Sequence, residues 1–312
     1  MSAKPHVDTK HGEVTLDDPA SPTSPEAPAA PTGLRGPIGL RPIAPFGRRL
    51  LTVTANERLG AYSVLRATDP DGPAPAAGQF AMLAAAEHWG AGEDERPYLP
   101  RAFSYARWVA REAQFLLEDV GPGTHRLCEL QAGDGLWVLG PLGRGFTAPR
   151  DARRALLVGG GVGIAPLAIW QDELNPVGAA GEQATVLLGF RDRLHAEGAA
   201  LLSNALVASD DGSVGRHGLV TDLLHAELDR DDHAGVYACG PPAMLEAVRA
   251  LCASREVPAQ LALEAGMACG FGACFGCVVP RRDGGYLRVC VDGPVVDAAH
   301  LDRVAAHVGG EL

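Results

Sequence analysis

The pattern of apolar segments changes near residue 153, and this change restricts the fold of the chain more than any other feature. Before it, short apolar segments separated by turn residues lie at 48–69, 78–86, 101–110 and 111–120. The first segment reads as two strands around a turn near Leu59–Gly60. Several short strands of this kind predict an antiparallel β-barrel or sandwich.

After residue 153, strand-like and helix-like segments alternate. The strand-like segments lie at 155–160, 184–190 and 235–240, and the helix-like segments at 165–174, 194–203, 218–228 and 241–255. This alternation predicts a parallel sheet with right-handed crossovers, as in nucleotide-binding α/β domains. The expected fold is therefore a β-barrel, then a parallel α/β domain, then a small cysteine-rich domain.

The first 45 residues have a different composition from the rest. They hold nine of the 24 prolines, with Ala, Ser and Thr between them and no apolar periodicity. Such a segment cannot bury enough apolar surface to offset the entropy lost on ordering, so we predict a disordered tail at 1–45. The remaining chain then divides into a β domain at 46–150, an α/β domain at 151–263 and a C-terminal domain at 264–312.

The charge of the chain narrows its partners and its location. The formal net charge is −11, and an acidic chain repels phosphate backbones, so no nucleic-acid partner is expected. No segment approaches the roughly 20 apolar residues that span a bilayer, and the N-terminus lacks a signal-peptide pattern. We expect a cytoplasmic protein with no membrane partner, in which clustered cysteines are metal ligands or redox groups rather than disulfides.

Four cysteines form the sharpest motif, spaced Cys269-x4-Cys274-x2-Cys277-x12-Cys290. Plant-type ferredoxins begin with the same x4, x2 spacing and bind a [2Fe-2S] cluster. Structural zinc sites usually pair two C-x2-C segments, so the spacing favours the cluster over zinc or an ordinary core. The intervening glycines are expected to permit turns with φ > 0 that direct backbone N–H groups at the sulfurs: Gly270, Gly272 and Gly276.

Two glycine-containing motifs follow strands of the α/β segment. In GGGVGIAPL (159–167), glycines let the backbone approach a pyrophosphate at a helix N-terminus, although a tight strand-to-helix turn would look similar. In CGPPAML (239–245), Cys239 ends a strand where a flat ring could lie against the backbone, or it is a small buried apolar residue.

Two further motifs lie in the β segment. Arg101 and Ser104 of RAFS are three residues apart, so they point to opposite faces of a regular strand. A ligand that touches both must wrap around the strand, or the strand must bend; a surface arginine and a turn serine are the alternative. GPGTHRLCEL (121–130) offers glycines and Thr124 ahead of a short helix, as a second phosphate cradle.

Together these motifs resemble the ferredoxin–NADP reductase superfamily, and within it the electron-transfer subunits of two-subunit, NAD-dependent dihydroorotate dehydrogenases. The resemblance covers about residues 46–300. RAFS, GPGTHRL, GPLGRGF (140–146), GGGVGIAPL and CGPPAML are similar to the family's flavin and nicotinamide motifs. EAGMACGFGACFGC with LRVCVDGPV is similar to its iron–sulfur segment. Ala102 stands where the subgroup commonly has proline.

The resemblance implies a role for each matching residue. It places Arg101 at the FAD pyrophosphate, Ser104 near flavin N5 and Cys239 near the nicotinamide, the last two as catalytic residues. The residues implied to bind FAD are Arg101, Ala102, Phe103, Ser104, Gly123 and Thr124. Those implied to bind NAD are Gly160, Gly161, Gly163, Cys239 and Gly240, and those implied to bind the [2Fe-2S] cluster are Cys269, Cys274, Cys277 and Cys290.

The resemblance also implies a reaction and a partner. An FMN-containing dihydroorotate dehydrogenase catalytic subunit, in a heterotetramer, would pass electrons through the cluster and FAD to NAD⁺ for pyrimidine biosynthesis. A relay subunit of a hydrogenase or of a ferredoxin-dependent transhydrogenase would carry nearly the same motifs. A scaffold that has lost electron transfer is the third reading, which the intact cysteine quartet disfavours.

The choice between NAD and NADP depends on charged residues after two strands. Arg191 and Arg193, which would attract a 2′-phosphate, flank Asp192, while Asp210 and Asp211 follow the next strand. Aspartates facing a 2′-phosphate would repel it, and NAD's ribose hydroxyls accept a carboxylate. The family resemblance favours NAD.

Overall fold

The computed structural model describes residues 47–90, 97–148, 153–175 and 184–304. The predicted disordered tail at 1–45 and the predicted boundary near residue 150 lie outside these residues. No helix within the described ranges is long and apolar enough to cross a membrane.

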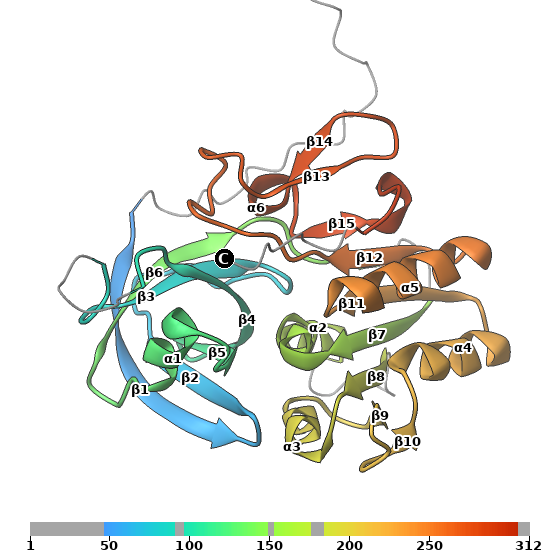
Figure 1. Ribbon diagram of the computed structural model, residues 1–312, viewed down its shortest axis with the longest axis horizontal. Helices are drawn as coiled ribbons and strands as arrows, with labels where there is room; N and C mark the ends of the chain where they lie inside the picture. Colours follow the sequence, from blue (N-terminus) through green and yellow to red (C-terminus); the bar gives the residue numbers. More distant parts are fainter. Residues whose placement is uncertain (1–46, 91–96, 149–152, 176–183, 305–312) are drawn as a thin grey trace, which may run out of the picture. The chain divides into compact units, whose positions relative to one another are not determined.

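Six antiparallel strands close into a barrel in the order β1-β2-β5-β4-β3-β6 (Figure 1). They are β1 (Arg49–Leu59), β2 (Tyr62–Thr68), β3 (Phe80–Ala85), β4 (Arg101–Val109), β5 (Glu112–Glu118) and β6 (Gly135–Leu142). Side chains alternate between the inside and the outside, so Leu51 and Val53 are buried while Leu50 is exposed. The predicted antiparallel β domain is confirmed, and it is a closed barrel; β6 was predicted only as a motif, not as a strand.

The second part is a seven-stranded sheet in the order β10-β9-β8-β7-β11-β12-β15. Its strands are β7 (Arg154–Gly160), β8 (Ala184–Phe190), β9 (Ala205–Ser209), β10 (Arg216–His217), β11 (Ala234–Cys239), β12 (Ala259–Ala262) and β15 (Val295–Asp297). All neighbours pair in parallel except β12 and β15, which are antiparallel. The predicted parallel α/β domain is confirmed, with shorter strands that the sequence pattern did not reveal.

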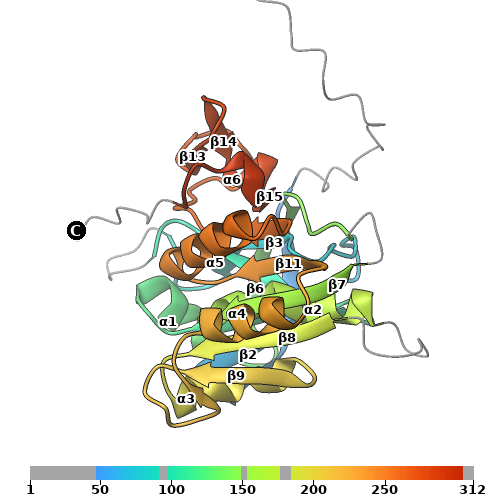
Figure 2. The same ribbon diagram turned by 90° about the vertical axis from the view of Figure 1, so that its right-hand side faces the viewer.

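The described helices pack on the barrel (α1), on both faces of the parallel sheet and in the C-terminal segment (α6). The α-helices are α1 (Pro122–Cys128), α2 (Ala165–Leu174), α3 (Arg193–Ala196), α4 (Val220–Arg230), α5 (Pro242–Ser254) and α6 (Val289–Asp292), and the 3₁₀ turns are η1 (Gly161–Ile164), η2 (Glu197–Leu201) and η3 (Ala298–His300). α2 lies on the barrel side and contacts β4, whereas α4 and α5 cover the opposite face (Figures 1 and 2).

The prediction of a continuous helix at 194–203 is wrong, because the structure has the short helix α3 followed by the 3₁₀ turn η2. Gly198 lies against the ring of Tyr62, where an added Cβ would come within 2.8 Å of the ring. The close packing of this segment against the barrel therefore determines its conformation, and the helical sequence pattern does not. A central glycine also weakens a continuous helix.

The C-terminal segment is joined to both other parts. It contains the hairpin β13 (Val278–Pro280) and β14 (Tyr286–Arg288), then α6, β15 and η3. β15 extends the parallel sheet by pairing with β12, and Pro294 forms a bridge with Arg144, which follows β6. This attachment ties the cysteine segment to the nucleotide-binding sheet and to the barrel.

Candidate functional site

A cavity of about 560 Å³, the first cavity, lies between the barrel and the carboxyl edge of the parallel sheet. β4, the start of α1, the turn after β7, the end of β11 and the segment after β12 all contribute to it. Its walls include Arg101, Ala102, Phe103, Ser104, Thr124, Gly163, Cys239 and Glu264. Motifs that are far apart in the sequence therefore line the same cavity.

The first cavity runs around the edge of β4. Every residue from Leu99 to Ser104 lines it, although successive side chains of a strand point to opposite faces. A ligand there could touch both Arg101 and Ser104, which disfavours the reading of a surface arginine and a turn serine.

Arg101 and Gly123 are packed together at the start of α1. A Cβ at Gly123 would lie 2.6 Å from Arg101 Nε, so the absence of a side chain lets the guanidinium approach the first helical turn. The predicted position of Thr124 ahead of a helix is wrong, because α1 already begins at Pro122, whose fixed φ suits a first helical position.

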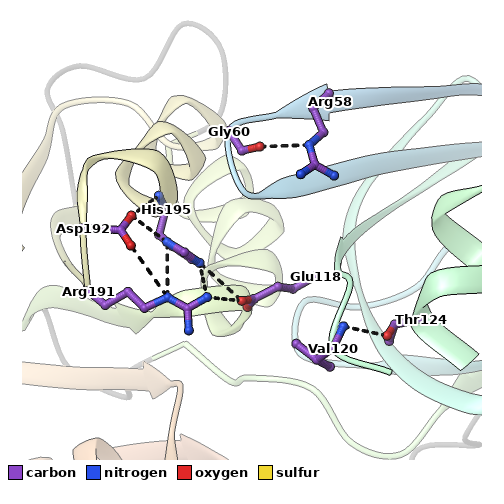
Figure 3. A network of polar contacts seen from close by, with 8 residues as sticks. All are labelled: Arg58, Gly60, Glu118, Val120, Thr124, Arg191, Asp192 and His195. Atoms are coloured by element: carbon purple, nitrogen blue, oxygen red, sulfur yellow. Dashed lines mark hydrogen bonds and ion pairs between the residues drawn. The ribbon is translucent and has the colours of Figure 1, made fainter. Parts of the chain in front are cut away.

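The hydroxyl of Thr124 has local hydrogen-bond partners. It accepts a bond from the Val120 N–H (2.9 Å) and donates one to the Gly121 carbonyl (2.9 Å; the Val120 contact is drawn in Figure 3). This side chain therefore holds the shape of the loop before α1. Together, the guanidinium and the first turn of α1 give the chemistry that a pyrophosphate requires.

A second cavity, of about 450 Å³, lies along the carboxyl ends of β7, β8, β9 and β11. Gly160 and Gly161 line it, and Gly161 adopts φ +55°, a conformation that favours glycine. Ligands of open α/β sheets bind at this edge. Glu118, the last residue of β5, lines both the first and the second cavity.

Gly163, in the turn η1 after β7, packs against Cys239 and Gly240 at the end of β11, beside the first cavity. A Cβ at Gly163 would lie 2.5 Å from the Cys239 carbonyl oxygen and 2.6 Å from Gly240 Cα. Cys239 is buried, and burial, reinforced by the charge of Glu264, raises the pKa of its thiol well above the ordinary value. The thiol is therefore protonated at neutral pH.

Replacing Gly163 by alanine is expected to destabilise the protein and to displace Cys239. The nearest atoms are backbone, which cannot move aside cheaply, so the free energy of unfolding should fall by about 1–3 kcal/mol. Chemical denaturation and the rate of NADH-dependent dye reduction measure the two effects. Unchanged stability together with an unchanged rate would contradict this packing.

Glu264 was not singled out from the sequence. It follows β12 and lines the first cavity with Cys239 and Ser104. The residue is exposed, and partial desolvation by the surrounding protein raises the pKa of its carboxyl group. Glu264 is the first residue of the motif EAGMACGFGACFGC, but only the fold shows that it reaches the cavity wall.

The four cysteines of the motif gather beside α6. Cys277 and Cys290 are buried with their sulfurs 3.2 Å apart, Cys269 is half-buried, and Cys274 is exposed. The Cys290 N–H and the Gly276 N–H point at the sulfurs of Cys277 and Cys274, both at 3.5 Å. Four thiols with backbone N–H groups directed at them fit an iron–sulfur cluster.

The thiols differ in their ionisation. Burial acts to raise the pKa of Cys269, but hydrogen bonds from the backbone of Cys274 and Phe271 outweigh it and lower the pKa to about 6. Burial and contact with Cys277 raise the pKa of Cys290 to about 12. Within the described ranges, no group of three or more His, Cys, Asp or Glu is arranged to hold a single metal ion.

The loop that carries the cysteines turns mostly as expected. Gly270 and Gly272 adopt φ of +78° and +89°. The expectation for Gly276 is wrong, because the positive φ in that turn belongs to Phe275, at +57°. This places the ring of Phe275 on the surface, where its side chain is 59% exposed.

Comparisons with known proteins agree with this arrangement. Residues 264–302 match the family model for the iron–sulfur cluster binding domain of dihydroorotate dehydrogenase B. The chain is 35% identical over 247 residues to the "Dihydroorotate dehydrogenase B (NAD(+)), electron transfer subunit" of Caldanaerobacter subterraneus, covering 78% of this chain and 94% of that protein. It is 40% identical over 214 residues to the protein of the same name from a Geobacillus species, covering 66% and 80%.

Solved structures show the same fold. A structure of the NADH-dependent reduced ferredoxin–NADP oxidoreductase aligns with a TM-score of 0.68 and 25% identity, covering 83% of this chain and 91% of that one. An Amycolatopsis cytochrome P450 reductase aligns with a TM-score of 0.53 and 25% identity, covering 67% and 66%. These findings confirm the resemblance first read from the motifs: the chain belongs to the family of electron transfer subunits of NAD-dependent dihydroorotate dehydrogenase B.

Proposed function

We propose that this chain passes electrons from an FMN-containing dihydroorotate dehydrogenase catalytic subunit, through a [2Fe-2S] cluster and FAD, to NAD⁺ in pyrimidine biosynthesis. The observation that carries the proposal is the adjacency of three sites in one chain. The first cavity suits a flavin, the second cavity suits a dinucleotide, and the cysteine quartet lies on the segment that leaves the first cavity. Bound FAD supplies the exchange between two-electron hydride chemistry and one-electron transfer.

The residue roles in this proposal follow the two cavities. Arg101 would neutralise the FAD pyrophosphate, and Ser104 would lie at the reacting edge of the flavin ring. Gly163 lets the turn after β7 pack directly against the backbone of Cys239, and the protonated Cys239 thiol places no charge beside the expected nicotinamide ring. Glu264 lies at the same end of the cavity, where desolvation raises the pKa of its carboxyl group.

The domain division at 46–150, 151–263 and 264–312 belongs to the same proposal. The match of residues 264–302 to an iron–sulfur domain supports the last boundary. A cytoplasmic location is also proposed, since reducing compartments keep clustered thiols available for metal. The assembly would be a heterotetramer of two subunit types.

The test is an assay of the reconstituted complex. The chain, loaded with its cofactors, is mixed with the FMN-containing catalytic subunit, and dihydroorotate-dependent reduction of NAD⁺ is followed. We expect turnover only when both subunits are present. A complex that forms but exchanges electrons only between ferredoxin and a nicotinamide nucleotide would instead support the transhydrogenase-type relay.

Two exposed aromatic side chains beside the cysteines suggest where the partner binds. Phe271 is 50% and Phe275 59% exposed, on the loop that holds Cys269 and Cys274. Changing both to serine is expected to weaken association with the catalytic subunit by at least about tenfold, because buried aromatic side chains dominate interface energies. Titration by calorimetry measures the effect.

Leu206→Ser is the matched control for this variant. Leu206 is 46% exposed on β9, at the other side of the parallel sheet, and its loss should leave association unchanged. Equal binding by the aromatic double variant and the unmodified chain would place the interface elsewhere.

A further inference from the structure

Arg191 occupies a position that would ordinarily favour NADP. It directly follows β8, the second strand of the parallel sheet along the chain, and it lines the second cavity. Beyond this strand, nucleotide-binding sheets contact the adenosine ribose: a carboxylate receives the 2′-hydroxyl of NAD, and an arginine accommodates the 2′-phosphate of NADP. A guanidinium free to bind a 2′-phosphate would favour NADP, whereas the names of the relatives specify NAD⁺.

The guanidinium of Arg191 is already engaged by the barrel (Figure 3). Its Nη2 donates to Glu118 Oε1 at 2.7 Å, which forms an ion pair between the end of β5 and the end of β8. The same group lies against the imidazole of His195, with Nε 3.3 Å from Nδ1. The Glu118 side chain is 20% exposed and the Arg191 side chain is 62% exposed, so the carboxylate is held in the protein while the guanidinium is open to solvent on its other side.

His195 fixes the geometry of the pair. Its side chain is 10% exposed, its Nε2 lies 3.3 Å from Glu118 Oε1, and its Nδ1 lies 2.7 Å from Asp192 Oδ1. The ring also meets that of Tyr62 edge-on, with centroids 5.7 Å apart. These contacts hold the imidazole in place beside the Arg191 guanidinium.

Carboxylates outnumber the guanidinium around this part of the second cavity. Glu118 and Asp210 both line it, and Asp192 Oδ2 lies 3.9 Å from Arg191 Nε. The positive charge of Arg191 is thus paired with Glu118, and a second carboxylate, that of Asp210, also lines the cavity. A 2′-phosphate would be repelled, whereas the hydroxyls of NAD could donate hydrogen bonds to carboxylate oxygens.

We propose that Glu118 makes this site select NAD over NADP by holding the Arg191 guanidinium in an ion pair, so that it cannot bind a 2′-phosphate. Glu118 is a positioning residue that acts through Arg191. The inference rests on the proposed function only in assuming that the second cavity receives a nicotinamide nucleotide.

The test variant is Glu118→Gln, which removes the charge and keeps the shape. The ratio of kcat/KM for NADPH to that for NADH, measured by dye reduction with the cofactor-loaded protein, is expected to rise at least about tenfold, the effect of one gained charge-assisted hydrogen bond. Calorimetric titration with adenosine 2′,5′-bisphosphate should show a similar gain in affinity, without a matching gain for adenosine 5′-monophosphate. If Glu118→Gln does not fold, Glu118→Ala is expected to give the same shift.

Two further variants separate this mechanism from a general change of charge. Glu57→Gln removes a carboxylate that pairs with Arg66 on the barrel surface. This variant should leave unchanged both the ratio of kcat/KM for NADPH to that for NADH and the affinity for adenosine 2′,5′-bisphosphate. In the double variant Glu118→Gln/Arg191→Gln, the gain for the bisphosphate should disappear.

A ratio within twofold of that of the unmodified protein, or a gain that survives in the double variant, would overturn the proposal. Failure of the unmodified chain to reduce dye with NADH would refute the proposed function instead. The bisphosphate titration would still decide the role of Glu118, because it needs no turnover.

Discussion

Replacing Cys274 by serine is expected to abolish the [2Fe-2S] absorption of the purified protein while FAD stays bound. Cys274 is the exposed member of the quartet, and its loss leaves three thiols for a cluster that needs four ligands. Dihydroorotate-dependent NAD⁺ reduction by the complex should fall roughly 100-fold or more, since electrons from the partner enter through the cluster. NADH-dependent dye reduction should persist, because hydride transfer to flavin does not require iron.

Visible absorption, iron and acid-labile sulfide content, and the two activities measure these effects. Cys128→Ser is the matched control, because Cys128 is a half-buried thiol outside the quartet, and that variant should keep its full cluster. A complete cluster signal in Cys274→Ser would show that the ligand assignment is wrong. Zinc without iron or sulfide in the unmodified protein would refute the cluster itself.

Replacing Arg101 by alanine is expected to weaken FAD binding by about 10- to 100-fold, the range for loss of a charge-assisted hydrogen bond. Arg101 lines the first cavity, and its guanidinium is packed against Gly123 at the first turn of α1. Its removal takes away the cation beside the expected pyrophosphate. The protein should be purified with less than one flavin per chain, and fluorescence titration gives the change in Kd.

Arg66→Ala is the control for this change. Arg66 is an arginine on β2, another strand of the barrel, and it pairs with Glu57 at the surface. Flavin content should be unchanged in this variant. Stoichiometric FAD in Arg101→Ala, with an unaltered Kd, would remove Arg101 from the flavin site and with it the reading of RAFS as a flavin motif.

The longer strands and helices could be predicted because their apolar patterns extend over enough residues to show a strand or helix period. β1 and β2 share an extended apolar segment with a turn, and α5 has a regular helical pattern over Pro242–Ser254. β9, β12 and β15 are only three to five residues long, too short for periodicity to separate a strand from a loop. Their pairing partners, not their own sequences, make them strands.

The candidate site shows the same division. Motif residues such as Arg101, Ser104 and Cys239 were named from the sequence, and the fold brings them to one cavity. Glu118 carries no local signal, since a single glutamate at the end of a strand is common, and the motif that begins at Glu264 does not show what this residue faces. Their significance depends on what they face: Arg191 across the domain contact and Cys239 inside the first cavity.

By itself, the sequence determined the order of the parts, the family and the spacing of the four thiols, because these depend on local patterns and short motifs. Only the tertiary structure decided how the parts meet. The antiparallel pairing of β15 with β12 joins the cysteine segment to the sheet, and Glu118 brings a carboxylate from the barrel to the guanidinium of Arg191. Both contacts join residues that are far apart in the chain, and their energies depend on distance and burial, which no local pattern encodes.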